Sequence, residues 1–435
     1  MYNNSVSINI SDDESDDING KKRARVRRKR KKFGFRGGKN NDFLRRMIKN
    51  LLRWWLFLLI IPAIGLLLFE ASRMIGTTKP IHDSKTAACL ELLPPEALEH
   101  LDIPVHGHAS SQVKKVIYKS DPDAGNTTVF QRNTDATRYN LFTGNQTLYE
   151  REQSFKVSET AEVHCGFYNE NGGYRISDED KAYMQTCKVV VSTCTFGGGD
   201  DIYQPIGMSE PSLKKVCYVA FWDEITVATQ EAGGKKIGED NMIEKWRIVV
   251  VKDLPFTDQR LNGKIPKMLT HRLFPQARYS IWVDSKSQFR RDPLGVLEAL
   301  LWRRTSMLAI SEHGARSSVY DEGKAVVKKN KATPEEVEIQ LEQYRRDGFP
   351  DEKRFNGKKA LSEASVIVRE LTPLTNLFMC LWFNEVVRFT SRDQLSFPYV
   401  VRKLNMKNIN MFPVCVRKDL VNSMGHKQKA KPLIN

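Results

Sequence analysis

Apolar runs of two kinds divide the chain. From about residue 162 onward, short runs rich in Val, Ile and aromatic residues alternate with longer segments of helical character. Several short runs are apolar on both faces, which is typical of strands in a parallel or mixed sheet that helices cover. The alternation predicts an α/β fold with a mixed, mostly parallel sheet flanked by helices. The predicted strands are residues 188–196, 215–223, 246–253, 278–284, 306–313 and 364–370.

Three of the longer segments begin with helix-start signals. Residues 333–348 open with Thr333 as N-cap and Glu336 at the third helical position, which together form a capping box. Residues 372–389 begin with the same Thr-Pro pair and carry an apolar stripe at helical spacing. Residues 293–304 begin with proline, so a helix is expected there as well.

The second kind of apolar run lies near the N-terminus, where residues 54–69 are uncharged. With two preceding leucines the run approaches the ~20 residues that span a ~30 Å hydrocarbon core. Basic residues precede it and Trp54 and Trp55 lie at its edge, as in a transmembrane helix whose N-terminus stays in the cytosol. The short span is typical of the early secretory pathway. We expect a single-pass type II Golgi membrane protein; a buried core helix and a cleaved signal peptide are the alternatives.

The net charge of +16 is concentrated at the N-terminus. Residues 1–53 hold 16 Lys or Arg against 6 Asp or Glu, so this segment carries +10 of the total. Its acidic and basic blocks are of low complexity and each block repels itself, which predicts a disordered tail. The rest of the chain is nearly balanced and gives no reason to expect a nucleic-acid partner.

All seven cysteines follow the N-terminal apolar run. A lumenal compartment permits disulfides, and an odd count leaves at least one thiol unpaired or bonded to another chain. The pairing itself stays open, and the lack of a Cys-x-x-Cys pair disfavours a zinc knuckle. Asn126 and Asn145 lie in Asn-x-Thr sequons, which are acceptors for N-glycosylation in the same compartment.

A glycine-rich segment follows the first predicted strand. Glycine lets the backbone approach a ligand closely, and open α/β sheets bind nucleotides beyond the carboxyl ends of their strands. The segment matches neither the Walker loop nor Gly-x-Gly-x-x-Gly, and an ordinary glycine-rich turn is the alternative. We expect its residues to bind a nucleotide: Gly197, Gly198, Gly199, Asp200 and Asp201.

The predicted strand 278–284 ends in Asp-Ser-Lys. Asp284 at that position can hold a divalent cation, which in turn holds a diphosphate. Lys286 suggests direct neutralisation of the diphosphate with less reliance on metal; a lysine that points to solvent or pairs with Asp284 is the alternative. Just before the strand, Lys264, Lys267 and His271 share one helical face. Lys264 and Lys267 are candidates for donor phosphates, with a solvated basic face as the alternative.

Two further polar clusters are candidates for chemistry. Glu312 and His313 follow another predicted strand, so Glu312 is a candidate base for an acceptor hydroxyl and His313 a candidate metal ligand. A structural histidine is the alternative for His313. Arg392, Asp393 and Gln394 lie at the start of a predicted helix and could hydrogen-bond a sugar, with Asp393 as a second candidate base. An ordinary Asp N-cap explains that cluster equally well.

Several long motifs resemble one plant domain family, and the resemblance covers roughly residues 160–420. The motifs include TCTFGGGDDIYQP, KMLTHRLFPQARYSIWVDSKSQ, ISEHGARSSVYDEG and LWFNEVVRFTSRDQLSFPYV. That family includes a mucilage-related probable hexosyltransferase of the Golgi and a turgor-regulation-defect protein described as an alkaline ceramidase, and it resembles glycosyltransferases of the GT-A type. By this resemblance Asp284 stands at the first Asp of a metal-binding motif and Lys286 departs from the second.

The resemblance implies a glycosyltransferase that uses a nucleotide-sugar donor, with Mn²⁺ or Mg²⁺ as cofactor, and a cell-wall polysaccharide or glycoprotein acceptor. The glycine-rich segment would line the donor, and Asp393 with Gln394 would lie on the acceptor side. A homo- or hetero-oligomer is compatible with this assignment. A ceramidase-type lipid amidohydrolase and a non-catalytic glycosyltransferase-like protein are the alternatives. We expect a cytosolic tail at residues 1–50, a transmembrane anchor at 51–70, a lumenal stem at 71–160, a GT-A-like catalytic domain at 161–420 and a C-terminal tail at 421–435.

Overall fold

The computed structural model describes residues 89–104, 112–119, 131–132, 138–139, 146–165, 174–355 and 357–425. All of them belong to one of the two compact units of the chain. The predicted tail and transmembrane anchor lie outside these residues, as do both sequon asparagines, Asn126 and Asn145. Within the described part, no helix has the length and apolar composition needed to cross a membrane.

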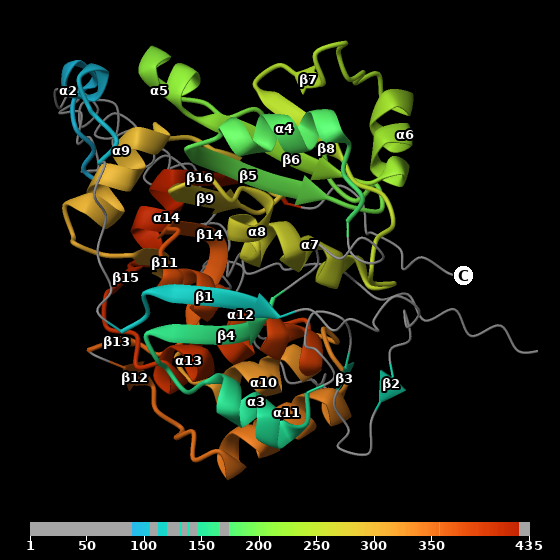
Figure 1. Ribbon diagram of the computed structural model, residues 1–435, viewed down its shortest axis with the longest axis vertical. Coiled ribbons are helices and arrows are strands. Elements are labelled where there is room, and N and C mark those ends of the chain that lie inside the picture. Colours follow the sequence, from blue (N-terminus) through green and yellow to red (C-terminus); the bar gives the residue numbers. More distant parts are fainter. Residues whose placement is uncertain are drawn as a thin grey trace, which may run out of the picture. The chain divides into compact units, whose positions relative to one another are not determined.

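A mixed eight-stranded sheet forms the centre of the described unit (Figure 1). All six strands predicted from the apolar runs are present in it, so the α/β prediction is confirmed. β8, β6, β5 and β9 run parallel, and antiparallel pairs flank them on both sides. In spatial order the strands are β15 (Ile409–Phe412), β11 (Leu308–Glu312), β14 (Ser362–Glu370), β9 (Tyr279–Val283), β5 (Val189–Thr195), β6 (Cys217–Trp222), β8 (Trp246–Val250) and β7 (Met242–Ile243).

Both faces of the sheet are buried because helices cover each of them. On β5, Val190 belongs to the same apolar cluster as α7 and α12, whereas Val189 and Val191 pack with α9, η3 and α14. The apolar character of the strand on both faces follows from this arrangement. The helices are α7 (Gln259–Met268), α12 (Pro373–Arg388), α9 (Pro293–Leu297), its π-helical continuation η3 (Glu298–Trp302) and α14 (Val414–Leu420).

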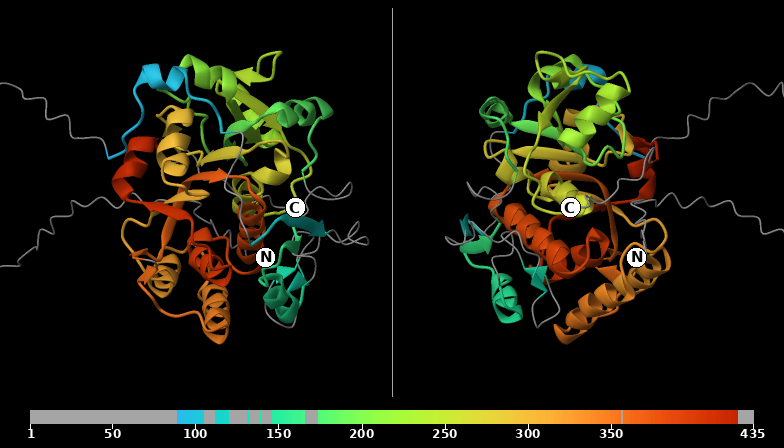
Figure 2. Two further views of the ribbon diagram at one scale, coloured as in Figure 1. Left: turned by 60° about the vertical axis from the view of Figure 1, so that its left-hand side comes forward. Right: turned by 90° about the vertical axis from the view of Figure 1, so that its right-hand side faces the viewer.

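Shorter elements surround this core. α10, α11 and α13 lie together, and α10 contacts both of the others (Figures 1 and 2). The remaining described helices are α2 (Pro95–Glu99), α3 (Leu148–Ser154), α4 (Asp178–Thr186), α5 (Glu210–Lys215), α6 (Glu224–Ala232), α8 (Thr270–Leu273), α10 (Val319–Lys328), α11 (Pro334–Arg346) and α13 (Asp393–Lys403). The remaining described strands pair as β1 (Lys115–Lys119) with β4 (Thr160–His164), β2 (Gln131–Arg132) with β3 (Arg138–Tyr139), β10 (Ser287–Phe289) with β16 (Val421–Ser423), and β12 (Arg354–Phe355) with β13 (Lys358–Lys359).

The predicted helix starts are present. The Thr333 hydroxyl accepts from the backbone N–H of Glu336 at 3.1 Å, and the Glu336 carboxylate accepts from the Thr333 N–H at the same distance, which is the predicted capping box. Thr372 caps α12 in the same way, with Thr375 as its partner. Local sequence therefore determines where these two helices begin.

Segments predicted as a stem and a tail contribute to the same unit. Arg151 of α3 reaches α12, where its Nε donates to Glu385 Oε1 at 2.6 Å. β1 and β4 pair in parallel and lie over α12 (Figure 1). At the other end, β16 pairs with β10. The described residues of the predicted stem thus pack on the central domain. Described residues on both sides of the predicted boundary at residue 160 belong to the same compact unit.

Six of the seven cysteines form disulfides, and the seventh is a buried free thiol, Cys194, at the end of β5. One bond joins the end of α4 to the first residue of β6. The other two link segments that are 215 and 326 residues apart in the chain. The three disulfides are Cys89–Cys415, Cys165–Cys380 and Cys187–Cys217.

Candidate functional site

The order of the parallel strands creates a switch point between β5 and β9. From β5 the chain continues to β6 and β8 on one side, and it then returns to β9 on the other side. Loops that leave the carboxyl ends of β5 and β9 therefore diverge, and ligands of open α/β sheets bind in the crevice between such loops. The glycine-rich segment follows β5, and the Asp-Ser-Lys turn follows β9.

The two predicted segments meet at this switch point. The Ser285 hydroxyl donates to Asp200 Oδ2 at 2.6 Å, which joins the turn after β9 to the loop after β5. Asp200 is buried, whereas Asp284, Ser285 and Asp201 are partly exposed. Polar groups from two loops thus share one edge of the sheet.

The glycine-rich loop uses its amides to hold its own shape. Gly197 N donates to Asp223 Oδ2 at 2.9 Å, and Gly198 N donates to the Thr226 hydroxyl at 3.0 Å. Both glycines have positive φ, at 68° and 70°. Both N–H groups already donate to side chains at the start of α6. They are therefore not available to bind a phosphate. Sequence reasoning missed Asp223, although an Asp between a buried strand and a helix is a detectable signal.

Lys264 and Lys267 are buried, so the solvated basic face considered as their alternative is wrong. Lys267 Nζ lies 3.2 Å from Asp284 Oδ1 and 2.9 Å from Asp393 Oδ2. Lys264 Nζ lies 2.7 Å from the same Asp393 oxygen. Asp284 Oδ1 also accepts from Trp282 Nε1 at 2.7 Å. Two ammonium groups and two carboxylates therefore alternate from the end of β9 to the start of α13.

Arg369 of β14 fixes the end of α7 that carries Lys267. Its guanidinium is fully buried and donates to the Lys267 carbonyl at 3.0 Å and to the Ser280 hydroxyl at 2.8 Å. The last turn of α7 has unsatisfied carbonyls, which a guanidinium can cap. Nothing in the sequence around Arg369 pointed to this role, because its partners lie about 90 to 100 residues away.

The end of β11 reaches the same edge, because β11 runs parallel to β9 through the antiparallel β14. Glu312 is partly exposed there, and its Oε1 accepts weakly from the backbone N–H of Lys359 at 3.4 Å. His313 is fully buried: Nδ1 accepts from the backbone N–H groups of Ala315 and Arg316 at 3.2 and 2.8 Å, and Nε2 faces Glu322. Its ring thus has the partners of a structural histidine, and the metal-ligand assignment of His313 does not fit.

The acceptor-side candidates lie at the start of α13. Asp393 is buried, and its Oδ2 contacts the ammonium groups of Lys264 and Lys267, so its carboxylate is poorly placed to meet an acceptor hydroxyl. Arg392 and Gln394 are buried beside it. The side-chain Oε1 of Gln394 is buried without a hydrogen-bond partner among the described residues. A buried amide oxygen in that state favours a donor from outside the chain.

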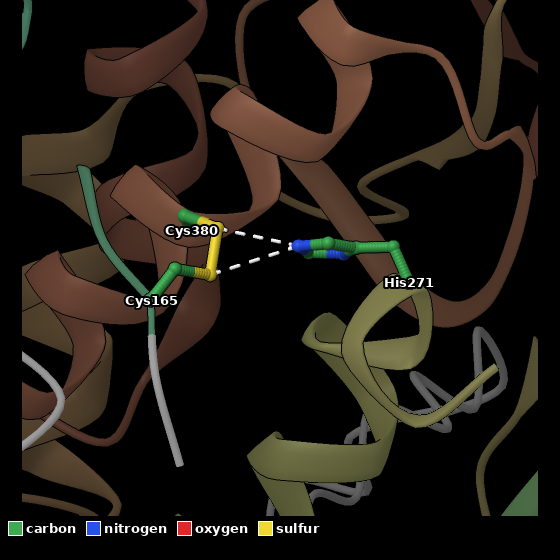
Figure 3. A group of neighbouring side chains, drawn as sticks. All are labelled: Cys165, His271 and Cys380. Atoms are coloured by element: carbon green, nitrogen blue, oxygen red, sulfur yellow. Dashed lines mark hydrogen bonds between the residues drawn. A yellow bond between two sulfur atoms is a disulfide. The ribbon is translucent and has the colours of Figure 1, made fainter. Parts of the chain in front are cut away.

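A second cluster lies around His271, which the sequence had placed on the face of Lys264 and Lys267. Figure 3 shows the ring pointing at the Cys165–Cys380 disulfide, with Nε2 3.6 Å from Cys165 Sγ and 3.3 Å from Cys380 Sγ. Burial lowers the pKa of His271 well below its usual value, and the charges of Arg369 and Arg272 lower it further. His271 is therefore a neutral packing residue of this disulfide.

The residues at the switch point do not fit a divalent cation well. Lys286 stands where a second carboxylate would be needed, and the Lys267 ammonium lies against one oxygen of Asp284. Among the described residues, one group of potential ligand side chains lies close enough together to share a metal ion. It consists of Cys165, His271 and Cys380. The two sulfurs of that group are bonded to each other, so it offers no thiolate ligand.

Two curated relatives match the chain. It is 38% identical over 302 residues to the Arabidopsis thaliana protein named probable hexosyltransferase MUCI70, an alignment that covers 66% of this chain and 51% of the relative. It is 32% identical over 301 residues to alkaline ceramidase TOD1 of the same species, covering 66% of this chain and 64% of the relative. The chain thus spans less than two thirds of the length of either relative.

Solved structures give a weaker likeness. The apo structure of the bifunctional glycosyltransferase WbbM matches at 12% identity and a TM-score of 0.32, covering 60% of this chain and 44% of that one. Mouse xyloside xylosyltransferase 1 matches at 9% identity and a TM-score of 0.28, covering 52% of this chain and 84% of that one. These scores carry no argument about the fold, which rests on the strand order. The family model described as TOD1/MUCI70, glycosyltransferase-like domain, matches residues 127–426, and the chain belongs to this family.

Proposed function

We propose that the chain is a glycosyltransferase with a GT-A-like fold, which transfers a hexose from a nucleotide-sugar donor to an acceptor hydroxyl. The observation that carries the proposal is the meeting of the loop after β5 with the turn after β9, through the hydrogen bond from Ser285 to Asp200. That contact lies where open α/β sheets bind nucleotides. Membership of a glycosyltransferase-like family supports the same reaction class.

The donor lies against the turn after β9 in this proposal. Ser285 and Asp284 are partly exposed, and their side-chain oxygens can accept hydrogen bonds from hydroxyl groups of the nucleoside. Lys286 lies within this turn and adds positive potential toward the diphosphate, while Lys264 and Lys267 of α7 offset the charges of Asp284 and Asp393. The glycine-rich loop around Gly197 then borders the donor. It does not bind the phosphates through the N–H groups of Gly197 and Gly198, because these donate to α6.

Glu312 is the base of the proposed reaction, and Asp393 is not. As the acceptor oxygen bonds to the anomeric carbon, the bond from that carbon to the diphosphate breaks, and the acceptor proton passes to the Glu312 carboxylate. Glu312 is partly exposed, and among the described residues its carboxylate accepts one long hydrogen bond, so an acceptor hydroxyl can reach it, whereas Asp393 is buried against two ammonium groups. Arg392 and Gln394 bind the acceptor, with Gln394 Oε1 accepting from a sugar hydroxyl.

A screen of nucleotide sugars with the purified full-length protein tests this function. Transfer or slow hydrolysis of one donor is expected, and Glu312→Gln is expected to lower kcat by about 100-fold or more. Glu335→Gln is the matched control, because Glu335 is exposed on α11 and away from the sheet edge. A complete lack of donor turnover across the panel would exclude the transferase.

The cellular setting is part of the proposal: a type II Golgi membrane protein with a lumenal catalytic domain and a cell-wall polysaccharide or glycoprotein acceptor. Three disulfides on the C-terminal side of the apolar run 54–69 support an oxidising compartment. Protease protection of a C-terminal tag in Golgi vesicles, together with a mobility shift on removal of N-glycans, tests the topology. Digestion of the tag in intact vesicles would contradict it.

A lipid amidohydrolase is the second candidate, because one relative is named an alkaline ceramidase. Amide hydrolysis of that kind commonly uses a metal-bound water held by several histidines. His271 contacts a disulfide and His313 is bound by its own backbone turn, so neither is placed for such a site. Assay of ceramide turnover with the same preparation separates the two candidates.

A further inference from the structure

We propose that the ammonium of Lys267 replaces the divalent cation at the donor site, so that nucleoside diphosphate binds without metal. The inference rests on the proposed transferase function. Lys267 Nζ lies 3.2 Å from Asp284 Oδ1 and 2.9 Å from Asp393 Oδ2. A positive group held between two carboxylates occupies the place that a divalent cation takes in a site of two carboxylate ligands.

The charge balance around Lys267 opposes the addition of a metal ion. Asp393, Lys264 and Lys267 are only 2%, 5% and 4% exposed, and Asp284 shares in the same contacts. Two ammonium groups already balance two carboxylates. A divalent cation bound at Asp284 would stand beside Lys267, and repulsion between like charges is strong where water is excluded. The four charged side chains therefore neutralise one another, and the two carboxylates have no charge left for a metal ion to balance.

The position of Lys267 is fixed from both ends of its side chain. At the backbone, Arg369 donates to the Lys267 carbonyl at 3.0 Å. At the tip, Trp282 Nε1 holds the Asp284 oxygen that contacts the ammonium, at 2.7 Å. A charge held in place before the ligand arrives stabilises the developing diphosphate charge without reorganisation. Lys286, buried in the turn after β9, brings a further positive charge to the same segment.

Calorimetry on the full-length protein in detergent tests the inference, with UDP, GDP and CDP as probes. For the diphosphate that binds, the Kd in EDTA and the Kd in Mn²⁺ are expected to agree within about twofold. Binding that needs Mn²⁺, with a difference of tenfold or more, would overturn the inference and leave the transferase standing. Failure of all three probes in both buffers would overturn the inference, whereas the transferase itself is decided by the screen of nucleotide sugars. Electron paramagnetic resonance of Mn²⁺ added with the diphosphate is expected to show no protein-bound ion.

Removal of the ammonium gives an independent readout. In Lys267→Met, Asp284 and Asp393 lose their shared cation, so the Tm is expected to fall and Mn²⁺ is expected to raise it again. Mn²⁺ should leave the Tm of the wild type and of the control Lys324→Met unchanged, since Lys324 has an 80% exposed side chain on α10. If Lys267→Met folds and its Tm does not change with Mn²⁺, Lys267 does not take the place of a cation between Asp284 and Asp393. If that variant does not fold, the wild-type calorimetry and resonance measurements still decide.

Discussion

Gly198 shows how one backbone conformation supports the candidate site. Its φ is +70°, and a Cβ added there would lie 2.6 Å from the Thr229 hydroxyl oxygen. Gly198→Ala is therefore expected to combine left-handed strain with a clash and to lower the free energy of unfolding by about 2 kcal/mol or more. Urea unfolding measures the change.

Gly234→Ala separates strain from the clash. Gly234 also has positive φ, at +86°, but nothing lies within 4 Å of an added Cβ. Its substitution should cost about 1 kcal/mol, from strain alone. Equal losses in the two variants would mean that the contact with Thr229 relaxes without cost, and that the glycine-rich loop is softer than the structure indicates.

His271 makes stability depend on pH. Burial, followed by the charges of Arg369 and Arg272, holds the pKa of His271 well below its usual value, whereas in the unfolded chain it titrates near ~6.5. Below that pH, His271 binds a proton in the unfolded state but stays neutral in the folded state. The free energy of unfolding should therefore fall by up to about 1.4 kcal/mol per pH unit from this residue as the pH drops below ~6.5. The contribution is fully retained above that pH.

His271→Gln tests the assignment through the slope, not through absolute stability. Denaturant unfolding between pH 7 and pH 5 should show a shallower decline in the variant than in the wild type. His100→Gln is the control, because His100 is exposed after α2 and should leave the slope unchanged. Parallel declines in wild type and His271→Gln would show that another group is responsible.

Which residues could be predicted depended on how far away their partners lie. Asp284 and Asp200 were placed at one edge because strand ends are visible in the sequence. Lys264 was misread as a solvated basic residue in one alternative because its partner Asp393 is 129 residues away. His313 offered two readings, and the backbone turn that fills Nδ1 decided for the structural one. Local patterns show position along an element, whereas pairing is a property of the folded chain.

At the scale of elements, long apolar strands were predictable and short edge strands were not. β5 is apolar on both faces and was found from the sequence, whereas β15 has four residues at the sheet edge and no distinct apolar run. α12 was expected to bury one stripe, yet nearly all of its residues are buried. The reason is that β1 and α3, predicted as part of a stem, cover its outer side together with β4.

Arg151 connects α3 to this helix and gives the test of that packing. Its guanidinium contacts Glu385 and Asp347 and lies 5.1 Å from the centre of the Tyr399 ring. Arg151→Met would leave Glu385 buried without its cation, so the free energy of unfolding is expected to fall by about 3–5 kcal/mol. Urea unfolding of the full-length protein measures this.

Arg175→Met is the matched control for Arg151→Met. Arg175 pairs with Asp253 at 3.0 Å, but both side chains are more than 60% exposed. Its loss should cost at most about 1 kcal/mol. A small effect of Arg151→Met would mean that α3 detaches easily from α12, and that the predicted stem is functionally separate after all.

At the scale of the whole described unit, the disulfides connect its first and last segments. Cys89–Cys415 joins residues 326 positions apart, and Cys165–Cys380 joins the β4 end to α12. Cross-links over such long separations restrict the unfolded chain most strongly in the entropy model. Seven cysteines allow many pairings, so the sequence could establish the odd thiol but not its identity.

Thiol counting tests this arrangement and, with it, the compartment in which the chain folds. Native protein should not react with a maleimide, because Cys194 is buried and burial, reinforced by Asp284, raises the pKa of its thiol. Unfolding without reductant should expose one thiol, mapped to Cys194 by mass spectrometry and absent in Cys194→Ser, and reduction should expose all seven. Labelling of Cys165 and Cys380 before reduction would show that these sulfurs are thiols beside His271. They would then be able to bind a metal, and labelling of all seven cysteines before reduction would remove the evidence for folding in an oxidising lumen.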